Sequence, residues 1–313
     1  MAIAVSKITL GIDVSKDQLV VFNWDTEERA TLENQPADIK AWLKSLYGPV
    51  RIAVEPTSSY HLELVEQAHT LGFEIYLINP RQLVHYRKAV GERNKTDEAD
   101  AWLLARYLDR ECASLRPFKP QCAKAQRLWA LIKRRGVAVS ARQKIQQSFR
   151  GTKIRTTALV TEIQKLIVRI DWHIQCLIRQ LAWQTDYQRC LSIPGIGPVN
   201  AAALTAVFHR GAFAGSDAYV AFIGLDVRLR ESGKFKGKRK LTKCGEAEIR
   251  RLLFCAAQAA RSYPPFDNYL QKQLEKGLSK IAAKVILARK LARIAFSLMA
   301  NQQSFKIQEI AYS

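Results

Sequence analysis

The sequence lacks any stretch of about 18 apolar residues, the minimum for a helix that crosses a bilayer, so we expect no membrane partner. Its first ten residues, MAIAVSKITL, lack the basic start and long apolar core of a secretion signal. The six cysteines, at positions 112, 122, 176, 190, 244 and 255, form no C-x-x-C pair and no zinc-ligand spacing with the five histidines. These absences predict a cytoplasmic protein with reduced, mostly buried thiols.

Acidic residues are the second scarcity, and they are missing altogether from residues 123–160. Residues 1–110 carry 13 Lys/Arg and 16 Asp/Glu, a net charge of −3, whereas the rest of the chain carries +24. An excess of one sign on this scale is typical of a protein that binds a polyanion. Because no membrane span is expected, nucleic acid is the partner that the charge predicts.

The first 110 residues alternate short apolar, β-branched runs with amphipathic helical segments. Strands are predicted over residues 8–14, 18–24, 29–33, 50–55 and 73–79, and helices over 37–47 and 61–72, from Pro80, and after Thr96. This order predicts an α/β domain over residues 1–112. With 313 residues, 48% of them hydrophobic, the chain is long enough for further domains, each with a core.

Four carboxylates occupy special positions in this predicted domain. Asp13 comes near the end of one apolar strand and Glu55 ends another, where an acid is costly to bury unless it is paired or bound to a metal. Asp97 and Asp100 are three residues apart, which places them on one face of the first turn of a helix. Mg²⁺, or Mn²⁺, takes such oxygen ligands, and two ions about 3.5–4 Å apart can drive a phosphodiester displacement.

The helical pair of acids also has a plainer interpretation. Thr96 can cap the helix, and acids are favoured at the positive end of the helix dipole whatever the protein does. The order of strand Asp, strand Glu and then two helical Asp nevertheless resembles the ribonuclease-H/RuvC-like nuclease fold with its four-acid site.

Residues 113–190 form a long helical tract in which Gly136 and Gly151 are expected to mark ends or kinks. Seven apolar residues recur in it at spacings of three and four, a coiled-coil-like stripe that suits either an internal helical hairpin or a dimer seam. They are Ile163, Leu166, Ile167, Ile170, Ile174, Leu177 and Leu181. The first half of the tract is basic without any acid, which favours a phosphate-binding face, with Arg134, Arg135 and Arg142 among its members, over an ordinary solvated surface.

Residues 191–313 form a predicted, mostly helical domain that opens with a glycine turn. Pro194-Gly195-Ile196-Gly197 precedes an Ala-rich helix, as in helix-hairpin-helix elements, whose amides hold a phosphate without reading sequence. A plain turn between two helices is the alternative.

A dense basic segment follows, and it contains a single serine, Ser232. Nearby cations can lower the pKa of such a hydroxyl and stabilise the charge that develops on phosphorus, although a serine beside glycine is more often a turn residue. The nucleic-acid contacts predicted in this domain are Gly195, Gly197, Arg228, Arg230, Lys234, Lys236, Lys238, Arg239 and Lys243.

Seven motifs occur in one order along the chain: GIDVSK, VEPTSSY, NKTDEADA, IPGIGPV, AFIGL, RESGKFKGKRKLTKCG, and K-x₄-RKLARIAF over residues 284–296. Together they resemble the insertion-sequence transposases with a RuvC-like four-acid (DEDD) N-terminal domain and a serine-containing C-terminal transposase domain. These proteins are relatives of the Piv/MooV DNA invertases and are described as bridge-RNA- or seek-RNA-guided recombinases. The sequence departs mildly from the pattern at Asp226-Val227, Thr242 and Cys244.

The resemblance implies catalytic acids at Asp13, Glu55, Asp97 and Asp100, with Mg²⁺ or Mn²⁺ bound to them, and a catalytic serine at Ser232. It also implies a structured guide RNA, double-stranded donor and target DNA, a homodimer that assembles into a tetramer, and a bacterial, nucleoid-associated location. Two alternatives remain: a RuvC-like nuclease or Holliday-junction resolvase that uses water, with Ser232 only structural, and a nucleic-acid-binding regulator without catalysis.

Overall fold

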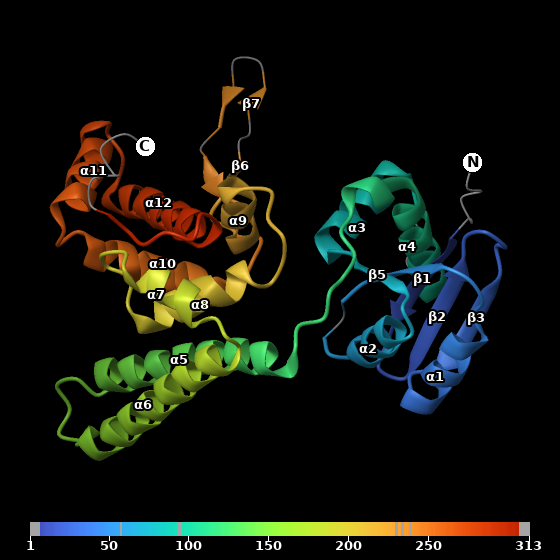
Figure 1. Ribbon diagram of the computed structural model, residues 1–313, viewed down its shortest axis with the longest axis horizontal. Coiled ribbons are helices and arrows are strands. Elements are labelled where there is room, and N and C mark those ends of the chain that lie inside the picture. Colours follow the sequence, from blue (N-terminus) through green and yellow to red (C-terminus); the bar gives the residue numbers. More distant parts are fainter. Residues whose placement is uncertain are drawn as a thin grey trace. The chain divides into compact units, whose positions relative to one another are not determined.

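A computed structural model describes residues 7–56, 58–92, 96–228, 231–232, 235–237 and 239–306; residues 231, 232, 235 and 236 are described through their backbone alone. The chain divides into two compact units, Met1–Pro120 and Gln121–Ser313 (Figure 1). The first unit is a mixed α/β domain and the second is mostly helical, as the sequence predicts.

A five-stranded sheet forms the centre of the first unit, in the order β3-β2-β1-β4-β5. β1 (Ile8–Val14) pairs antiparallel with β2 (Gln18–Asn23), which pairs antiparallel with β3 (Arg29–Glu33). On the other side β1 pairs parallel with β4 (Val50–Val54), and β4 pairs parallel with β5 (Glu74–Leu77). The predicted order of strands and helices is confirmed.

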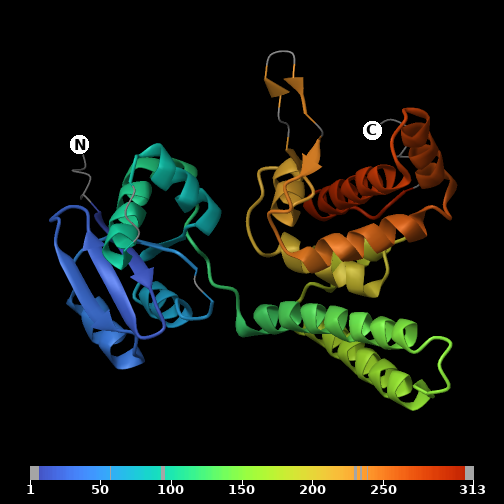
Figure 2. The ribbon, with the colours of Figure 1, turned by 180° about the vertical axis from the view of Figure 1, so that it is seen from behind.

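Helices cover both faces of this sheet (Figures 1 and 2). Alternation along β1 sends Leu10, Ile12 and Val14 into a core with α1 (Pro36–Ser45) and α2 (Leu62–Thr70). The opposite face packs against α3 (Pro80–Ala89) and α4 (Asp97–Glu111). Thr9, Gly11 and Asp13 therefore point to the α4 side of the sheet.

α4 lies unusually close to β1, and Gly11 is what permits it. A Cβ atom at Gly11 would sit 2.1 Å from the carbonyl oxygen of Ala101 and 2.3 Å from the amide nitrogen of Ala105. A van der Waals contact needs well over 3 Å, so only glycine fits between the strand and the helix backbone. The contact fixes the position of α4 along β1.

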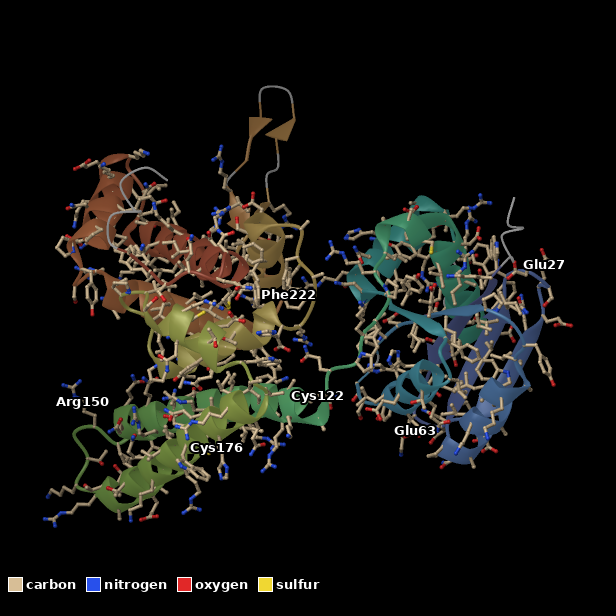
Figure 3. All side chains as sticks on the ribbon, in the orientation of Figure 1. Glu27, Glu63, Cys122, Arg150, Cys176 and Phe222 are labelled. Carbon is tan, nitrogen blue, oxygen red and sulfur yellow. The ribbon has the colours of Figure 1, made fainter. Side chains whose placement is uncertain are left out.

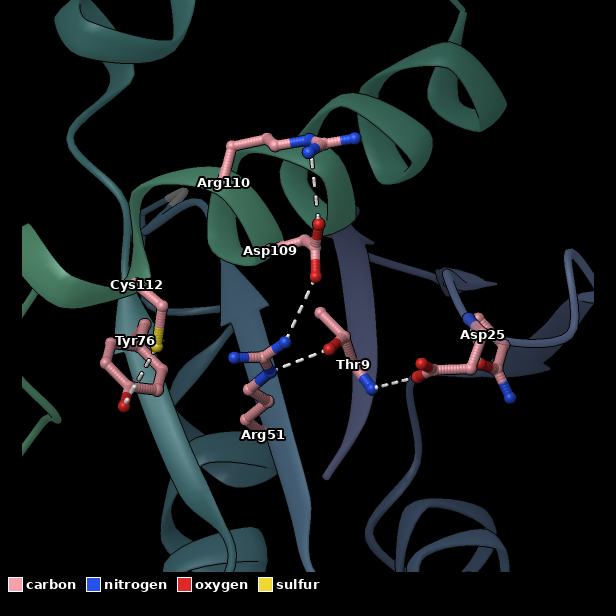
Figure 4. A network of polar contacts seen from close by, with 8 residues as sticks. Thr9, Asp25, Arg51, Tyr76, Asp109, Arg110 and Cys112 are labelled. Atoms are coloured by element: carbon pink, nitrogen blue, oxygen red, sulfur yellow. Dashed lines mark hydrogen bonds and ion pairs between the residues drawn. The ribbon is translucent and has the colours of Figure 1, made fainter. Parts of the chain in front are cut away.

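A polar network holds the C-terminal part of α4 to the sheet (Figure 4). Arg51 of β4 donates from Nε to the Thr9 hydroxyl at 2.7 Å and forms an ion pair with Asp109 of α4 at 3.2 Å. The Thr9 amide donates to Asp25 at 2.7 Å. Beyond α4, the short helix η1 (Cys112–Ser114) places the Cys112 sulfur 3.8 Å from the Tyr76 hydroxyl. α4 is thus held at its middle by packing and near its end by paired charge.

The second unit begins with a helical hairpin, α5 (Ala123–Ser148) and α6 (Thr157–Gln180). It continues with α7 (Gln184–Leu191), α8 (Pro198–Phe208) and α9 (Ser216–Ile223). Four two-residue strands follow: β6 (Val227–Arg228), β7 (Glu231–Ser232), β8 (Phe235–Lys236) and β9 (Lys240–Leu241). The last helices are α10 (Ala247–Ala260), α11 (Pro264–Glu275) and α12 (Lys280–Ala300).

One continuous core joins the hairpin to the later helices of this unit. Leu128 of α5 and Ile174 of α6 belong to the same buried cluster as Ala203 of α8, Leu253 of α10 and Leu291 of α12. The region over residues 113–190, which the sequence suggests as a domain of its own, therefore shares a core from α5 onward with residues 191–313.

The apolar stripe of α6 is only partly buried within the chain. Ile167, Ile170, Ile174 and Leu177 pack in the core, whereas the Leu166 side chain is 48% exposed. An internal hairpin accounts for the buried members, and the dimer seam stays a prediction.

The two glycines of the helical tract behave differently from one another. Gly151 has a positive φ of +80° in the connection between α5 and α6, so it marks a break as predicted. Gly136 does not mark a helix end, because α5 continues through it. Its missing side chain makes room for the Glu248 carboxylate of α10, which would be 2.4 Å from a Cβ atom there.

No helix in the described part of the chain is both long and apolar enough to span a bilayer.

We expect Gly11→Ala to destabilise the first unit by about 3 kcal/mol, because the new methyl group meets backbone atoms that cannot move aside. Urea unfolding followed by tryptophan fluorescence measures this change. Gly211→Ala is the control, since a Cβ atom there meets nothing within 4 Å, and its stability should stay within about 0.5 kcal/mol of the wild type. Equal stabilities for the two variants would contradict the close approach of α4.

Candidate catalytic site

Asp13 and Glu55 lie side by side at one edge of the sheet. Ile12 of β1 is paired with Val54 of β4 in parallel register, so the next residues along the two strands are Asp13 and Glu55. Neighbouring strands are about 4.8 Å apart, and residues at matching positions point to the same face. Both carboxylates therefore lie on the face that α4 covers.

The other two acids come from the first turn of α4. The Thr96 hydroxyl accepts a hydrogen bond from the Ala99 amide at 3.2 Å, so the predicted helix cap is present. Because Ala101 lies over Gly11, the turn before it lies over the end of β1 that carries Asp13. Asp97 is exposed and Asp100 is half-buried. Capping and clustering of the acids thus occur together, and neither excludes the other.

The clustering has an electrostatic signature at Asp13. Burial, together with the negative charges of Asp100, Asp97 and Glu55, raises the pKa of the Asp13 carboxyl to about 6, against the opposing effect of the Val14 amide. A group of like charges with this effect on one member is a natural site for a cation, because a cation would remove the repulsion. The charge of the site therefore fits a divalent metal ion.

A guanidinium group supplies part of that positive charge. Arg87 of α3 forms an ion pair with Asp100, and both side chains are largely buried, with exposures of 15% and 13%. In the described part of the chain, no three Asp, Glu, His or Cys side chains converge closely enough to hold a metal ion. The four acids are neighbours across the edge without pointing to one common centre.

The predicted catalytic serine belongs to the second unit. Ser232 is in β7 and pairs with Phe235 of β8. Below this pair, β6 and β9 form a second short ladder, in which Val227 faces Leu241. Among the predicted cations of this segment, Arg228, Arg239 and Lys243 are exposed, Lys236 is described only through its backbone, and Arg230, Lys234 and Lys238 lie outside the described residues.

Backbone contacts fix the base of this segment, which we call the clasp: residues 223–227 and 241–245. The Thr242 amide donates to the Asp226 carbonyl at 3.0 Å, and its hydroxyl bonds the Asp226 carboxylate. A Cβ atom at Gly245 would lie 2.4 Å from the carbonyl oxygen of Phe222, so the backbones of the two segments approach each other closely here. Arg250 ties both sides by donating to the carbonyls of Ile223 and Gly245, at 3.1 and 2.7 Å.

The basic residues of the hairpin divide between internal pairs and free surface. Arg135 forms an ion pair with Asp171 of α6 at 2.5 Å, and Arg142 hydrogen-bonds Gln164. Arg134 is exposed, and Arg150 lies at the end of the hairpin where α5 and α6 are joined (Figure 3). Binding of nucleic acid by Arg134, Arg135 and Arg142 stays a prediction, with the first of them the most accessible.

In the glycine turn before α8, close packing requires glycine at one of the two glycine positions. Gly195 has φ of +88°, and a Cβ atom there would lie 2.7 Å from the Ala260 backbone at the end of α10. Gly197, at the start of α8, meets nothing within 4 Å. An open helix start can accept an anion, so Gly197 is the better of the two candidates for a phosphate contact.

Sequence reasoning missed Arg87 and Gly11. Arg87 lies in the last turn of α3, an amphipathic helix, and only the packing of α3 against α4 brings it to Asp100. For Gly11 a signal existed, since a glycine inside an apolar strand often marks the close approach of another backbone.

Two family profiles match the chain. Residues 10–152 match a transposase family of DEDD type named for IS110, and residues 187–271 match the transposase IS116/IS110/IS902 family. The pilin gene-inverting protein of Moraxella lacunata is 26% identical over 320 residues, which cover 96% of this chain and 98% of that protein. A probable family 20 transposase of Pseudomonas aeruginosa is 24% identical, with coverage of 95% and 98%.

A further relative is the transposase for insertion sequence element IS1111A of Coxiella burnetii, 27% identical over 75% of this chain and 74% of that protein. The four-acid edge, the basic second unit and these relatives define a transposase, a DNA recombinase of mobile elements. Both profiles carry the name IS110; the first runs from β1 past the end of α5, and the second from α7 into α11. The two family matches and these relatives identify the chain as an insertion-sequence transposase with IS110-type domains.

Replacing Asp13 by Asn should raise the stability of the metal-free protein at pH 7 by about 1 kcal/mol, after allowance for screening by water. The folded-state pKa of Asp13 lies above the unfolded value, so the wild type loses stability as pH rises from about 4 to 6. The gain from the substitution should therefore vanish below about pH 4. Chemical denaturation at several pH values tests this, with exposed Asp17→Asn as the control. A gain that is independent of pH would contradict repulsion at Asp13.

Proposed function

We propose that this transposase cuts and rejoins DNA strands with Ser232 as the nucleophile and with Asp13, Glu55, Asp97 and Asp100 as the ligands of Mg²⁺ or Mn²⁺. The observation that carries the proposal is the clustering of four acids at the sheet edge, where burial and the charges of three acids raise the pKa of Asp13. Acids that raise one another's pKa in a cluster are a frequent feature of functional sites, and Arg87 is ion-paired with one member of this cluster, Asp100.

The strand order supports a RuvC-like assignment for the first unit. An antiparallel trio β3-β2-β1 continued by parallel β4 and β5 places one acid at the end of β1 and one directly after β4. Ligands bind at the carboxyl ends of parallel strands, where loops and helix starts can add further groups. α4 supplies the remaining two acids there.

Each group has a defined task in this proposal. The four acids would hold the divalent ion, which when bound supplies Lewis-acid stabilisation of the scissile phosphate. Arg87 must release Asp100 for that carboxylate to take part, and the guanidinium is then placed to contact a phosphate oxygen itself. The nearby backbone contact at Gly11 keeps the helix start over the strand ends throughout.

The serine step is a transesterification. Ser232 Oγ forms a bond to phosphorus and its proton passes to solvent or to a base, while the bond from phosphorus to the 3′ oxygen breaks. The DNA 5′ end is left on the protein as a phosphoserine, and attack by a 3′ hydroxyl reverses the step to rejoin strands. The exposed cations Arg228 and Arg239 support this role, because they stabilise charge at phosphorus.

The partners are donor and target DNA duplexes together with a structured guide RNA. The net charge of +24 outside the first 110 residues supports extensive contact with phosphates. Base pairing by the RNA would read sequence, and the protein would read shape and backbone charge. The exposed apolar residues Leu166, Val168 and Trp172 on α6 support a homodimer, and two dimers holding two duplexes give a tetramer.

Ser232→Ala should abolish strand cleavage while RNA and DNA binding stay within about twofold of the wild type. End-labelled DNA, run on a denaturing gel with the protein, should reveal a covalent adduct for the wild type and none for the Ser232 variant. Ser262→Ala replaces an exposed serine elsewhere in the unit and should keep both activities. Cleavage by the Ser232 variant without an adduct would instead support a RuvC-like nuclease or resolvase that uses water.

Removal of the metal ion or of one acid should also stop cleavage. EDTA should silence the wild type, and added Mg²⁺ or Mn²⁺ should restore it, whereas Asp13→Ala should lower the rate by at least about a hundredfold in either metal. Asp17→Ala removes an exposed acid from the same unit and should have no effect. Full activity of the wild type in EDTA would rule out the metal assignment.

A further inference from the structure

A cavity of about 540 Å³ lies in the second unit along α12, which packs against both α9 and α11 (Figures 1 and 2). Its wall is the C-terminal half of α12, together with Tyr269 of α11, Ser216 at the start of α9, and Phe305 after α12. The volume falls in the range of about 300–1,000 Å³ that small-molecule sites occupy. The four acids belong to the other unit, so the proposed chemistry does not use this cavity.

One wall of the cavity carries a buried positive charge. Lys290 is only 9% exposed, and its ammonium lies 4.3 Å from the ring centroid of Tyr269. Burial lowers the pKa of this lysine. A buried ammonium over an aromatic face is stabilised by the ring, and an anion entering the cavity would stabilise it further.

A second cation and a helix start lie beside Lys290. Arg293 is part of the lining and forms an ion pair at 2.6 Å with Asp217, whose side chain is 84% exposed. Such an exposed pair holds its partner weakly, so Arg293 can turn to a ligand at little cost. Ser216 begins α9, whose preceding Gly215 provides no side-chain cap for the helix amides. The cavity therefore offers two cations and uncapped amides to one anionic group.

Flat apolar surfaces form the rest of the wall. Phe305 stacks on Phe266 with ring centroids 6.0 Å apart and an interplanar angle of 25°, and it lines the cavity together with Tyr269 and Phe296. A few polar side chains line the cavity beside these rings. Asn301 donates to the Ser297 hydroxyl at 3.1 Å, and both residues line the cavity. An amide and a hydroxyl of this kind can hydrogen-bond the edge of a planar ring.

The combination points to one class of ligand. A flat ring that stacks on aromatic side chains, with polar edges and an attached anion, is a nucleotide whose base has left its stack. A base-paired duplex cannot present a single base in this way, whereas a single strand can. We propose that this cavity binds one unstacked nucleotide of single-stranded nucleic acid, with the base against Tyr269 and Phe305 and the phosphate at Lys290 and Arg293.

The proposal rests on the proposed function only in requiring that single-stranded nucleic acid is present, either as the guide RNA or as a DNA strand opened for exchange. The two sources share base and phosphate and differ in the sugar. The protein needs neither Ser232 nor the four acids for this binding. A binding measurement in EDTA, where strand cleavage is expected to be absent, therefore tests the cavity separately from catalysis.

Photochemical crosslinking to full-length protein gives the direct test. A single-stranded oligonucleotide containing 5-iodouracil, made once as RNA and once as DNA, should crosslink to Tyr269 or Phe305, as identified by peptide mass spectrometry. The same strand in a perfect duplex should not. Crosslinking by either sugar supports the cavity and identifies the source. Crosslinks found only on other peptides, with both strands, would overturn the proposal.

Variants supply the quantitative test at a fixed salt concentration. Phe305→Ala should weaken binding of the single strand about tenfold through lost stacking, and duplex affinity should not change. Lys290→Met removes the buried charge, so single-strand affinity should fall about fivefold, with circular dichroism to show that the variant is folded. Matched controls are Lys280→Met, an exposed residue at the other end of α12, and Tyr47→Ala, whose ring is 84% exposed in the first unit.

Two further outcomes would overturn the nucleotide assignment. One is equal affinity for a strand with abasic sites, because the base would then contribute nothing. The other is protection of the peptide by free uridine monophosphate at the concentration of the strand, which would make a mononucleotide the ligand. A protein that crosslinks as expected but never cleaves DNA would disprove the proposed function alone, and one that cleaves with no crosslink in the cavity would disprove the cavity alone.

Discussion

The contact between the backbone of α4 and the bare α-carbon of Gly11 is the constraint on which the first unit depends. It sets how far α4 is advanced along β1, and so it decides which turn of the helix lies over the ends of the strands. The ion pair between Arg51 and Asp109 acts on the same coordinate from the other end of the helix. Two independent contacts thus determine one position, and the four carboxylates are brought together as a consequence of backbone packing.

That arrangement stores electrostatic energy in the folded state. Asp13 is partly buried beside acids that come from a neighbouring strand and from a helix start, and both burial and these charges raise its pKa. Arg87 relieves only part of the repulsion through Asp100. Functional sites commonly hold such unfavourable charge because the rest of the fold compensates, here through the extensive apolar cores on both faces of the sheet. A bound cation would neutralise this repulsion. The acid cluster would then destabilise the metal-free form alone.

Much of this unit could be predicted from the sequence. Short apolar and β-branched runs locate the strands, and the strand predicted over residues 29–33 agrees with β3, Arg29–Glu33. The acids at strand ends and at the start of α4 follow from the same patterns. Arg87 could not be found in this way. Its partner, Asp100, is 13 residues further along the chain and lies on a different helix, α4, which packs against α3. Long-range packing also decided the place of Gly136, whose glycine signal suggested a break and serves instead to admit Glu248.

The cavity of the second unit illustrates the same limit. Lys290 and Arg293 read in sequence as members of a basic helix, and Tyr269 and Phe305 as ordinary apolar residues. Only the packing of α9, α11 and α12 shows that one cation is buried over a ring and that a hollow lies beside it. Composition could indicate an anionic partner, but not where a single base would fit.

The clasp at the base of the serine-bearing segment has a geometric consequence. The chain leaves and re-enters the helical body at one point. There Gly245 lies close to the Phe222 carbonyl, and Arg250 donates hydrogen bonds to carbonyls on both sides. Because both ends of the segment are held at this point, residues inserted between the two halves of the clasp would lengthen the segment alone and leave α9 and α10 in place.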